Sequence, residues 1–289
     1  MNRDRRRAQS RLSGLRLKRK ALAYAILVAF SIPFGFPLAW NLSTSLQTIQ
    51  EVYAGSMIRI PADPQWGNYV KVFEFLPLGR FLANTFCITG LGLLGELMTA
   101  PLVAFAFARL RFPFRDTLFV VMLSTLMLPP IVTMIPTYIF YSKLGFVDTW
   151  IPLILPGWLG GGAFSIFIFR QFFLSVPVDL EDAARIDGCS HFGVYLRIFL
   201  PLAFPALATI GVLSFAGRWN DFEAPLIYLQ TIEKFPIALG ITIFKEAYSV
   251  IAPHYLMAAS VISLAPLLIL FFAIQKVFVE GIILSGIKG

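Results

Sequence analysis

Charged residues, cysteine and histidine are all scarce in this chain. Only 14% of its 289 residues are Asp, Glu, Lys or Arg, whereas soluble domains carry about 25%. Two cysteines, Cys87 and Cys189, are too few for a disulfide framework or a cysteine-based metal site, so we expect free thiols. The two histidines, His191 and His254, show no metal-ligand spacing, and no metal site is predicted.

Sequence motifs for nucleotide hydrolysis and for common enzymes are also missing. There is no G-x-x-x-x-G-K-[ST] phosphate loop, so the chain is not itself an ATPase. There is no H-E-x-x-H or G-x-S-x-G that would favour an intramembrane enzyme. We therefore predict a non-enzymatic protein that binds no cofactor itself.

Apolar residues are abundant: 57% of the chain is hydrophobic, and the mean hydropathy is +0.76. Continuous runs of about 20 apolar residues are typical of membrane spans, and unbroken runs favour helices over barrel strands. We predict an all-α polytopic membrane protein with six transmembrane helices. The expected spans are 21–42, 82–108, 114–140, 151–171, 206–229 and 257–279.

Basic residues indicate the orientation in the membrane. The net charge is +8, and nine of the 24 Lys and Arg precede residue 21. We interpret residues 1–20 as a basic cytosolic tail that touches anionic lipid, in preference to a nucleic-acid site. With the N-terminus inside, the cytosolic segments hold 17 Lys and Arg and the external loops hold 6, which predicts that both termini are cytosolic.

One charged stretch, residues 176–203 and called the charged loop below, lies between apolar runs on the predicted cytosolic side. Asp179, Glu181 and Asp182 suit the first turn of a helix, where negative charge complements the helix dipole. Glu181 and Arg185 are spaced i, i+4 in the favourable order for an ion pair.

The remainder of the charged loop predicts a turn and a second helix. Gly188 can adopt the left-handed conformation that ends a helix, and Ser190 can cap a second helix over about 191–200. Ala183 and Ala184 make a shallow surface on the first helix. An interfacial amphipathic loop and a docking element for a soluble partner both fit this pattern.

The spacing within the charged loop resembles the EAA motif of ABC importer permeases. That motif reads E-A-A, three residues, Gly, nine residues, then Ile-x-Leu-Pro. Here Asp182 stands where the family has Glu, and Glu181 precedes it, which leaves open which carboxylate contacts the ATPase. The residues that the resemblance assigns to ATPase coupling are Glu181, Asp182, Ala183, Ala184, Asp187, Gly188, Ile198, Leu200 and Pro201.

Three further stretches resemble the carbohydrate-uptake, MalG-like branch of that family. They are KLGFVDTW at 143–150, WNDFEAPLIYL at 219–229 and VFVEGIILSGIKG at 277–289. The resemblance implies the type I ABC importer transmembrane fold over residues 21–289 and an ATPase-facing tail at 280–289. It identifies the chain as a sugar permease subunit in the cytoplasmic (inner) membrane of a prokaryote.

The resemblance also implies the partners and their division of work. A second permease, most simply in a heterodimer, would form the other half of the pathway. Two ATPase subunits would hold ATP and Mg²⁺, and an extracellular or periplasmic solute-binding protein would deliver the sugar. Alternatives are an ABC permease for a glycerophosphodiester or polyol, and an ion-driven secondary transporter; the sequence shows no repeat that the secondary transporter would predict.

Charged side chains within the predicted spans are candidates for the substrate pathway. Intramembrane charges cost roughly 2.5–3.5 kcal/mol each on insertion scales, so they face a partner or a cavity. Arg218 can pair with Glu96 or with Asp221, and either pair would serve helix packing as well as a polar lining. The candidate pathway residues are Glu96, Arg218, Trp219, Asn220, Asp221 and Glu223.

Overall fold

The computed structural model describes residues 2–54, 61, 63–248 and 251–286, and it describes side chains over 20–54, 61, 63–246 and 251–275. Every regular element within the described residues is helical. The elements are α1 (Asn2–Ser45), α2 (Ile49–Tyr53), α3 (Asn68–Phe75), α4 (Leu78–Arg109), α5 (Arg115–Ser124), η1 (Thr125–Met127), α6 (Pro130–Lys143), α7 (Ile151–Trp158), α8 (Ala163–Ser175), α9 (Val178–Ile186), α10 (His191–Val194), η2 (Tyr195–Phe199), α11 (Leu200–Leu202), α12 (Phe204–Trp219), α13 (Glu223–Tyr228), η3 (Ile232–Lys234), α14 (Ile237–Tyr248) and α15 (Pro253–Gly286).

The chain forms two compact units, Met1–Val72 with Tyr248–Val261, and Phe73–Ala247 with Ile262–Gly289. In the first unit α1 runs without a break from the basic tail into its apolar part. The amide of Asn68 ties the end of α1 by donating to the carbonyls of Ser45 and Gln47, at 2.9 and 3.0 Å.

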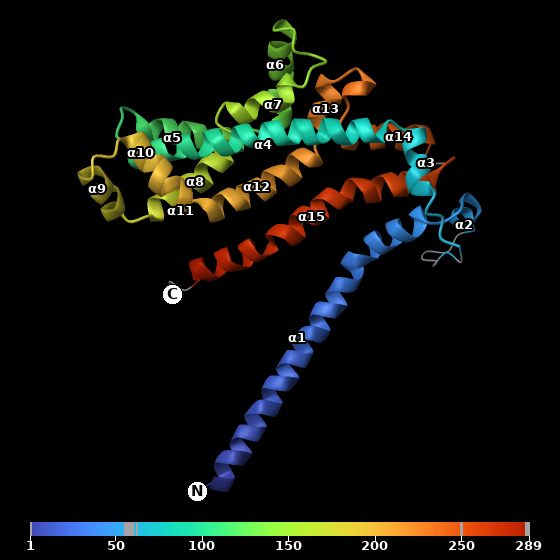
Figure 1. Cartoon of the computed structure of the whole chain (residues 1–289), viewed down its shortest axis with the longest axis horizontal. Coiled ribbons are helices and arrows are strands. Elements are labelled where there is room, and N and C mark those ends of the chain that lie inside the picture. Colours follow the sequence, from blue (N-terminus) through green and yellow to red (C-terminus); the bar gives the residue numbers. More distant parts are fainter. Residues whose placement is uncertain (1, 55–60, 62, 249–250, 287–289) are drawn as a thin grey trace. The chain divides into compact units, whose positions relative to one another are not determined.

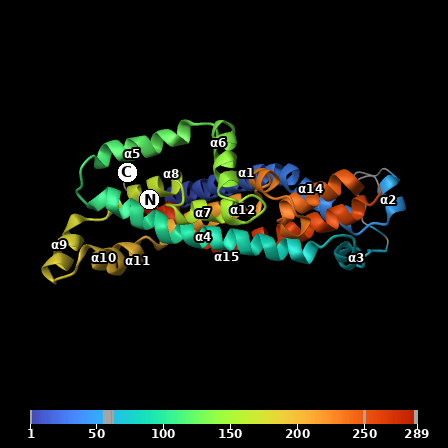
Figure 2. The ribbon, with the colours of Figure 1, turned by 90° about the horizontal axis from the view of Figure 1, so that it is seen from above.

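The long helix α4 organises the second unit. Helices α7, α8 and α12 pack against it (Figures 1 and 2). An apolar cluster joins α4 and α8 to the charged loop, with Phe105, Phe169, Phe173 and Phe199 all buried in it. Aromatic rings dominate this cluster because each buries a large apolar area.

The helices agree with the predicted membrane spans in part. Among the residues that the structure describes, four segments are long and apolar enough to cross a membrane: Lys20–Ser45, Leu78–Arg109, Ile151–Ser175 and Pro253–Gln275. Two bent helix pairs raise the number to six if each pair is one span. The all-α polytopic prediction is confirmed, while the count of six and the cytosolic termini stay predictions.

Three predicted spans are not continuous helices. The one at 151–171 is interrupted between Trp158, the last residue of α7, and Ala163, the first residue of α8. The span at 114–140 bends by 103° between Met127 and Pro130, because two consecutive prolines lack the N–H donors of a helix and restrict the preceding residue. The span at 206–229 was wrong at its end: α12 stops at Trp219, and α13 begins only at Glu223. The polar residues Asn220 and Asp221 lie in the break between the two helices.

Candidate functional site

The charged loop folds as a helix, a glycine turn and a second helix, which confirms the predicted local structure. Gly188 has a φ of 83°, and its N–H donates to the carbonyl of Arg185 at 3.0 Å. The Ser190 hydroxyl caps the second helix by accepting from the Gly193 amide at 3.1 Å. That helix runs through α10, the π-helical η2 and α11. In both ribbon views, α9 to α11 lie near the same end of α4 (Figures 1 and 2).

Glu181 points into the protein, not toward solvent. Its side chain is 10% exposed, and its Oε2 lies 4.0 Å from Nη1 of Arg109. The expected Glu181–Arg185 pair does not form, because Arg185 bonds the ring of His191 instead. Helical geometry explains the difference, since Glu181 lies on the same buried face as Ala184.

The outward surface of the charged loop combines acidic and apolar side chains. Asp182, Ala183 and Asp187 are exposed, and Ala184 is buried in the aromatic cluster. Ile186 is 86% exposed and was not predicted as a site residue. Ile198 and Leu200 pack against the cluster, while Pro201 is exposed. The predicted coupling residues therefore divide into an outward set and a packing set.

The candidate pathway charges Glu96 and Arg218 form a buried polar network. Arg218 Nη2 lies 3.0 Å from Glu96 Oε2, with side chains 21% and 4% exposed. Glu96 also accepts from the hydroxyls of Ser165 and Ser214, at 2.5 and 2.9 Å. Arg218 donates to the carbonyl of Leu153 at 3.3 Å. The network therefore joins α4, α7, α8 and α12.

The other predicted pathway residues are not brought together around one opening. Trp219 is 1% exposed, and its indole donates to the carbonyl of Ser263 at 3.0 Å. Asn220 bonds back to the carbonyl of Ala216. Asp221 accepts from the Ala224 amide at 3.2 Å, in the break before α13. Because α12 ends at Trp219, the expected shared helical face of Arg218 and Asp221 does not exist.

Glu223 is different, because it lines a hollow between α6 and α13. The hollow has a volume of about 450 Å³, and its lining includes Thr133, Thr137, Glu223 and Tyr228. Tyr228 also stacks with Tyr138, with ring centroids 6.1 Å apart. Hydroxyls, a carboxylate and one aromatic ring together suit a polyhydroxylated solute.

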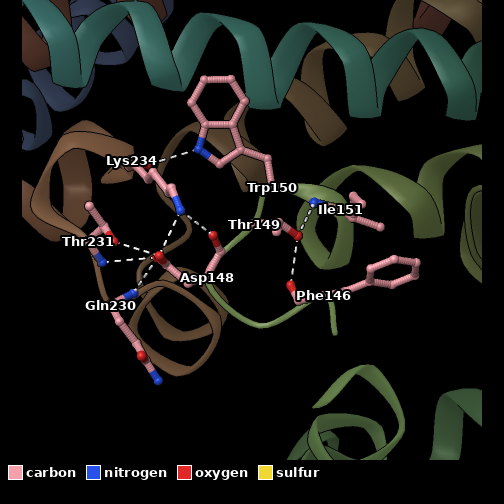
Figure 3. Close-up of polar contacts among 8 residues, drawn as sticks. All are labelled: Phe146, Asp148, Thr149, Trp150, Ile151, Gln230, Thr231 and Lys234. Carbon is pink, nitrogen blue, oxygen red and sulfur yellow. Dashed lines mark hydrogen bonds and ion pairs between the residues drawn. The ribbon is translucent and has the colours of Figure 1, made fainter. Parts of the chain in front are cut away.

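Asp148, in the 143–150 stretch, is the centre of a second polar cluster (Figure 3). Its carboxylate accepts from the amides of Gln230 and Thr231, both at 3.0 Å, and from Lys234 Nζ at 2.7 Å. Lys234, the Thr231 hydroxyl and these amides hold the pKa of Asp148 well below its usual range. The cluster fixes the loop before α7 against the loop after α13.

We expect Asp148→Asn to loosen this junction, because the amide keeps the shape but loses the charge that Lys234 neutralises. A depressed pKa stabilises the fold above the unfolded value near 3.8, and that stabilisation is lost as the pH falls through the folded value. Hydrogen exchange at residues 230 and 231 should be faster in the variant at neutral pH, and the two proteins should converge in strong acid. Equal exchange at neutral pH would contradict this role.

The described part of the chain offers no metal site, and both of its cysteines are free thiols. No group of three or more His, Cys, Asp or Glu is placed to hold a metal ion among those residues. Cys87 and Cys189 are free, as expected. Arg109, Ser165 and Ser214 were not predicted as site residues. The signal in the sequence for Arg109 was a basic residue closing a span, and the two serines had none.

Comparison with known proteins gives one family. Residues 100–283 match a family described as "Binding-protein-dependent transport system inner membrane component". An arabinooligosaccharides transport system permease protein, AraQ of Halalkalibacterium halodurans, is 31% identical, over 88% of this chain and 91% of the relative. An sn-glycerol-3-phosphate transport system permease protein, UgpE of Agrobacterium fabrum, is 30% identical, over 91% and 96%.

The fold agrees with a solved structure of the same kind. A chain of a bacterial ABC transporter involved in the import of the acidic polysaccharide alginate superposes with a TM-score of 0.78. It is 26% identical, and the match covers 90% of this chain and 96% of that one. The type I importer fold and the prediction of a transport subunit are thereby confirmed, and the chain belongs to the family of binding-protein-dependent transport system inner-membrane components, the permease subunits of ABC importers.

Proposed function

We propose that the chain forms half of the translocation pathway of an ATP-driven sugar importer. A separate ATPase subunit binds the charged loop and drives the transport cycle through it. The observation that carries the proposal is the outward surface of that loop. Exposed Asp182 and Asp187 flank Ile186, a residue that is 86% exposed. An exposed apolar side chain with a charged rim has the arrangement of a protein interface, an apolar centre with polar surroundings.

The two candidate carboxylates take different roles in this proposal. Asp182 is exposed and available to the ATPase, whereas Glu181 is turned inward toward Arg109. Asp182 therefore makes the ATPase contact, although the family has Glu at this position. Gly188 and Pro201 shape the loop, and Ile198 and Leu200 fasten it to the apolar cluster.

The sugar would pass the hollow beside Glu223. Its carboxylate and the hydroxyls of Thr133, Thr137 and Tyr228 can exchange hydrogen bonds with sugar hydroxyls, and aromatic faces can stack on sugar rings. Glu96, Arg218 and Trp219 hold the helices that position this hollow. The relative named for arabinooligosaccharides supports a sugar. The relative named for sn-glycerol-3-phosphate keeps a phosphorylated polyol as the second candidate.

The complete importer would contain further subunits. A second permease would complete the pathway, two ATPase subunits would hold ATP and Mg²⁺, and a periplasmic or extracellular binding protein would deliver the solute. The complex would lie in the cytoplasmic (inner) membrane of a prokaryote. The basic tail 1–20 would contact anionic lipid. Residues 280–289 would reach the ATPases; their side chains lie outside the described part of the structure.

Co-purification tests the proposed docking. The wild-type chain should retain its ATPase subunits through detergent extraction, and Asp182→Lys should lose them, because the reversed charge faces the groove that accepts Asp182. Asp179→Lys is a matched control, an exposed acidic residue in the first turn of the same helix. If Asp182→Lys retains the ATPase at the wild-type ratio, Asp182 does not contribute to the ATPase contact.

A further inference from the structure

Arg109 joins the long helix α4 to three parts of the chain around the charged loop. It is the last residue of α4, and its side chain is only 7% exposed. Nη1 lies 4.0 Å from Glu181 of α9. Nη2 donates to the carbonyls of Phe173 and Val176 at the end of α8, where a helix presents acceptors without intrahelical partners.

The same guanidinium also contacts the second helix of the charged loop. Its central carbon lies 4.9 Å from the centre of the Phe199 ring in η2, within the range of a cation–π contact. One side chain therefore reaches α8, α9 and η2 from the end of α4.

An apolar cluster also joins the charged loop to α4, but it constrains their relative position less than the guanidinium of Arg109 does. Ala184, Tyr195 and Phe199 of the loop share the cluster with Phe105 of α4. Burial of apolar surface is non-directional, so such a contact resists separation more than sliding. The planar guanidinium has a fixed fork of donors and defines one relative placement.

We propose that Arg109 is a positioning residue that makes the charged loop and the cytosolic half of α4 move as one body when the ATPases close. The inference rests on the proposed docking of this loop to an ATPase. Glu181 is the loop side of the connection, and the carbonyls at the end of α8 complete it. Because α4 also carries Glu96, loop motion reaches the ion pair with Arg218 through one continuous helix.

Spin-label distances in the assembled transporter test this rigid connection. Labels go on cysteines replacing Leu102 of α4 and Leu196 of η2, which are 42% and 44% exposed, after replacement of Cys87 and Cys189. The complex is measured without nucleotide and trapped with ATP and vanadate. We expect one unchanged distance in the otherwise wild-type complex. Arg109→Gln should add a second distance, and only in the trapped state.

Matched variants separate positioning from general damage. Arg185→Gln removes an exposed arginine of α9 that bonds His191, and it should leave the single distance unchanged. Glu181→Gln weakens the same contact from the loop side, so it should reproduce the second distance even if Arg109→Gln fails to assemble. Arg109→Lys keeps the positive charge but loses the forked donors of the guanidinium. It should give a smaller population at the second distance than Arg109→Gln does.

Two results would overturn the proposal while the ATPase remains bound. One is a distance that changes on trapping in the otherwise wild-type complex. The other is a single, unchanged distance in Glu181→Gln and in any Arg109→Gln complex that assembles. Loss of the ATPase from the wild-type complex would instead contradict the docking role, and co-purification measures that separately.

Discussion

Gly188→Pro should abolish ATP-driven solute uptake while leaving the protein in the membrane. Gly188 has a φ of 83°, and its N–H bonds the Arg185 carbonyl. Proline fixes φ near −65° and has no N–H, which costs about 3 kcal/mol or more where both are needed. The turn must therefore rearrange and separate the two helices of the charged loop, and uptake into vesicles should fall to background.

Graded variants make this prediction specific to the backbone. A Cβ at Gly188 would meet no atom within 4 Å, so Gly188→Ala changes only backbone strain, about 1–2 kcal/mol, and should reduce uptake partially. Gly193→Ala, in the helical part of the same loop, is the matched control and should keep uptake. Wild-type uptake by Gly188→Pro would show that the loop geometry is dispensable.

Glu96→Gln and Arg218→Gln should each lower the amount of folded protein in the membrane severely. Removing one member of a buried ion pair leaves an uncompensated charge and costs about 3–5 kcal/mol. Glu96 also accepts from Ser165 of α8 and Ser214 of α12, so a displaced side chain at position 96 disturbs those helices as well. Quantitative blotting of membrane fractions measures the loss.

The double replacement Glu96→Met with Arg218→Met distinguishes packing from solute binding. Replacing both members of a buried pair by apolar residues is often nearly neutral, so the level should recover. Glu223→Gln is the comparison at the hollow and should keep the protein level while altering solute preference. Single variants of Glu96 and Arg218 at normal level, with changed solute preference, would instead place them in the pathway.

The charged loop was predictable because its signals are local. Helix dipole, glycine stop and serine cap act within a few residues, and α9, Gly188 and Ser190 lie as expected. The direction of Glu181 was not predictable, because Arg109 is distant in sequence and approaches only after α4 and α8 pack. An i, i+4 pair is weak, about 0.2–0.5 kcal/mol, so a buried partner outweighs it.

The sequence predicted which segments are apolar helices better than it predicted where those helices are interrupted. Hydropathy identifies apolar segments but is insensitive to backbone breaks, so it missed the 103° bend before Pro130 and the end of α12 at Trp219. The pairing of Arg218 with Glu96 depended on which helices meet. Once α12 ended before Asp221, the competing helical pair had no common face.

Solute uptake into proteoliposomes that contain the complete wild-type complex tests most directly whether this chain belongs to an ATP-driven sugar importer that is coupled through the charged loop. The assay uses a panel of radiolabelled sugars and glycerol 3-phosphate, with the binding protein outside and ATP on the side of the charged loop. We predict uptake of at least one sugar that requires ATP, persists when ionophores collapse all ion gradients, and disappears in Gly188→Pro. Uptake that follows an ion gradient and is indifferent to ATP and to Gly188 would contradict it.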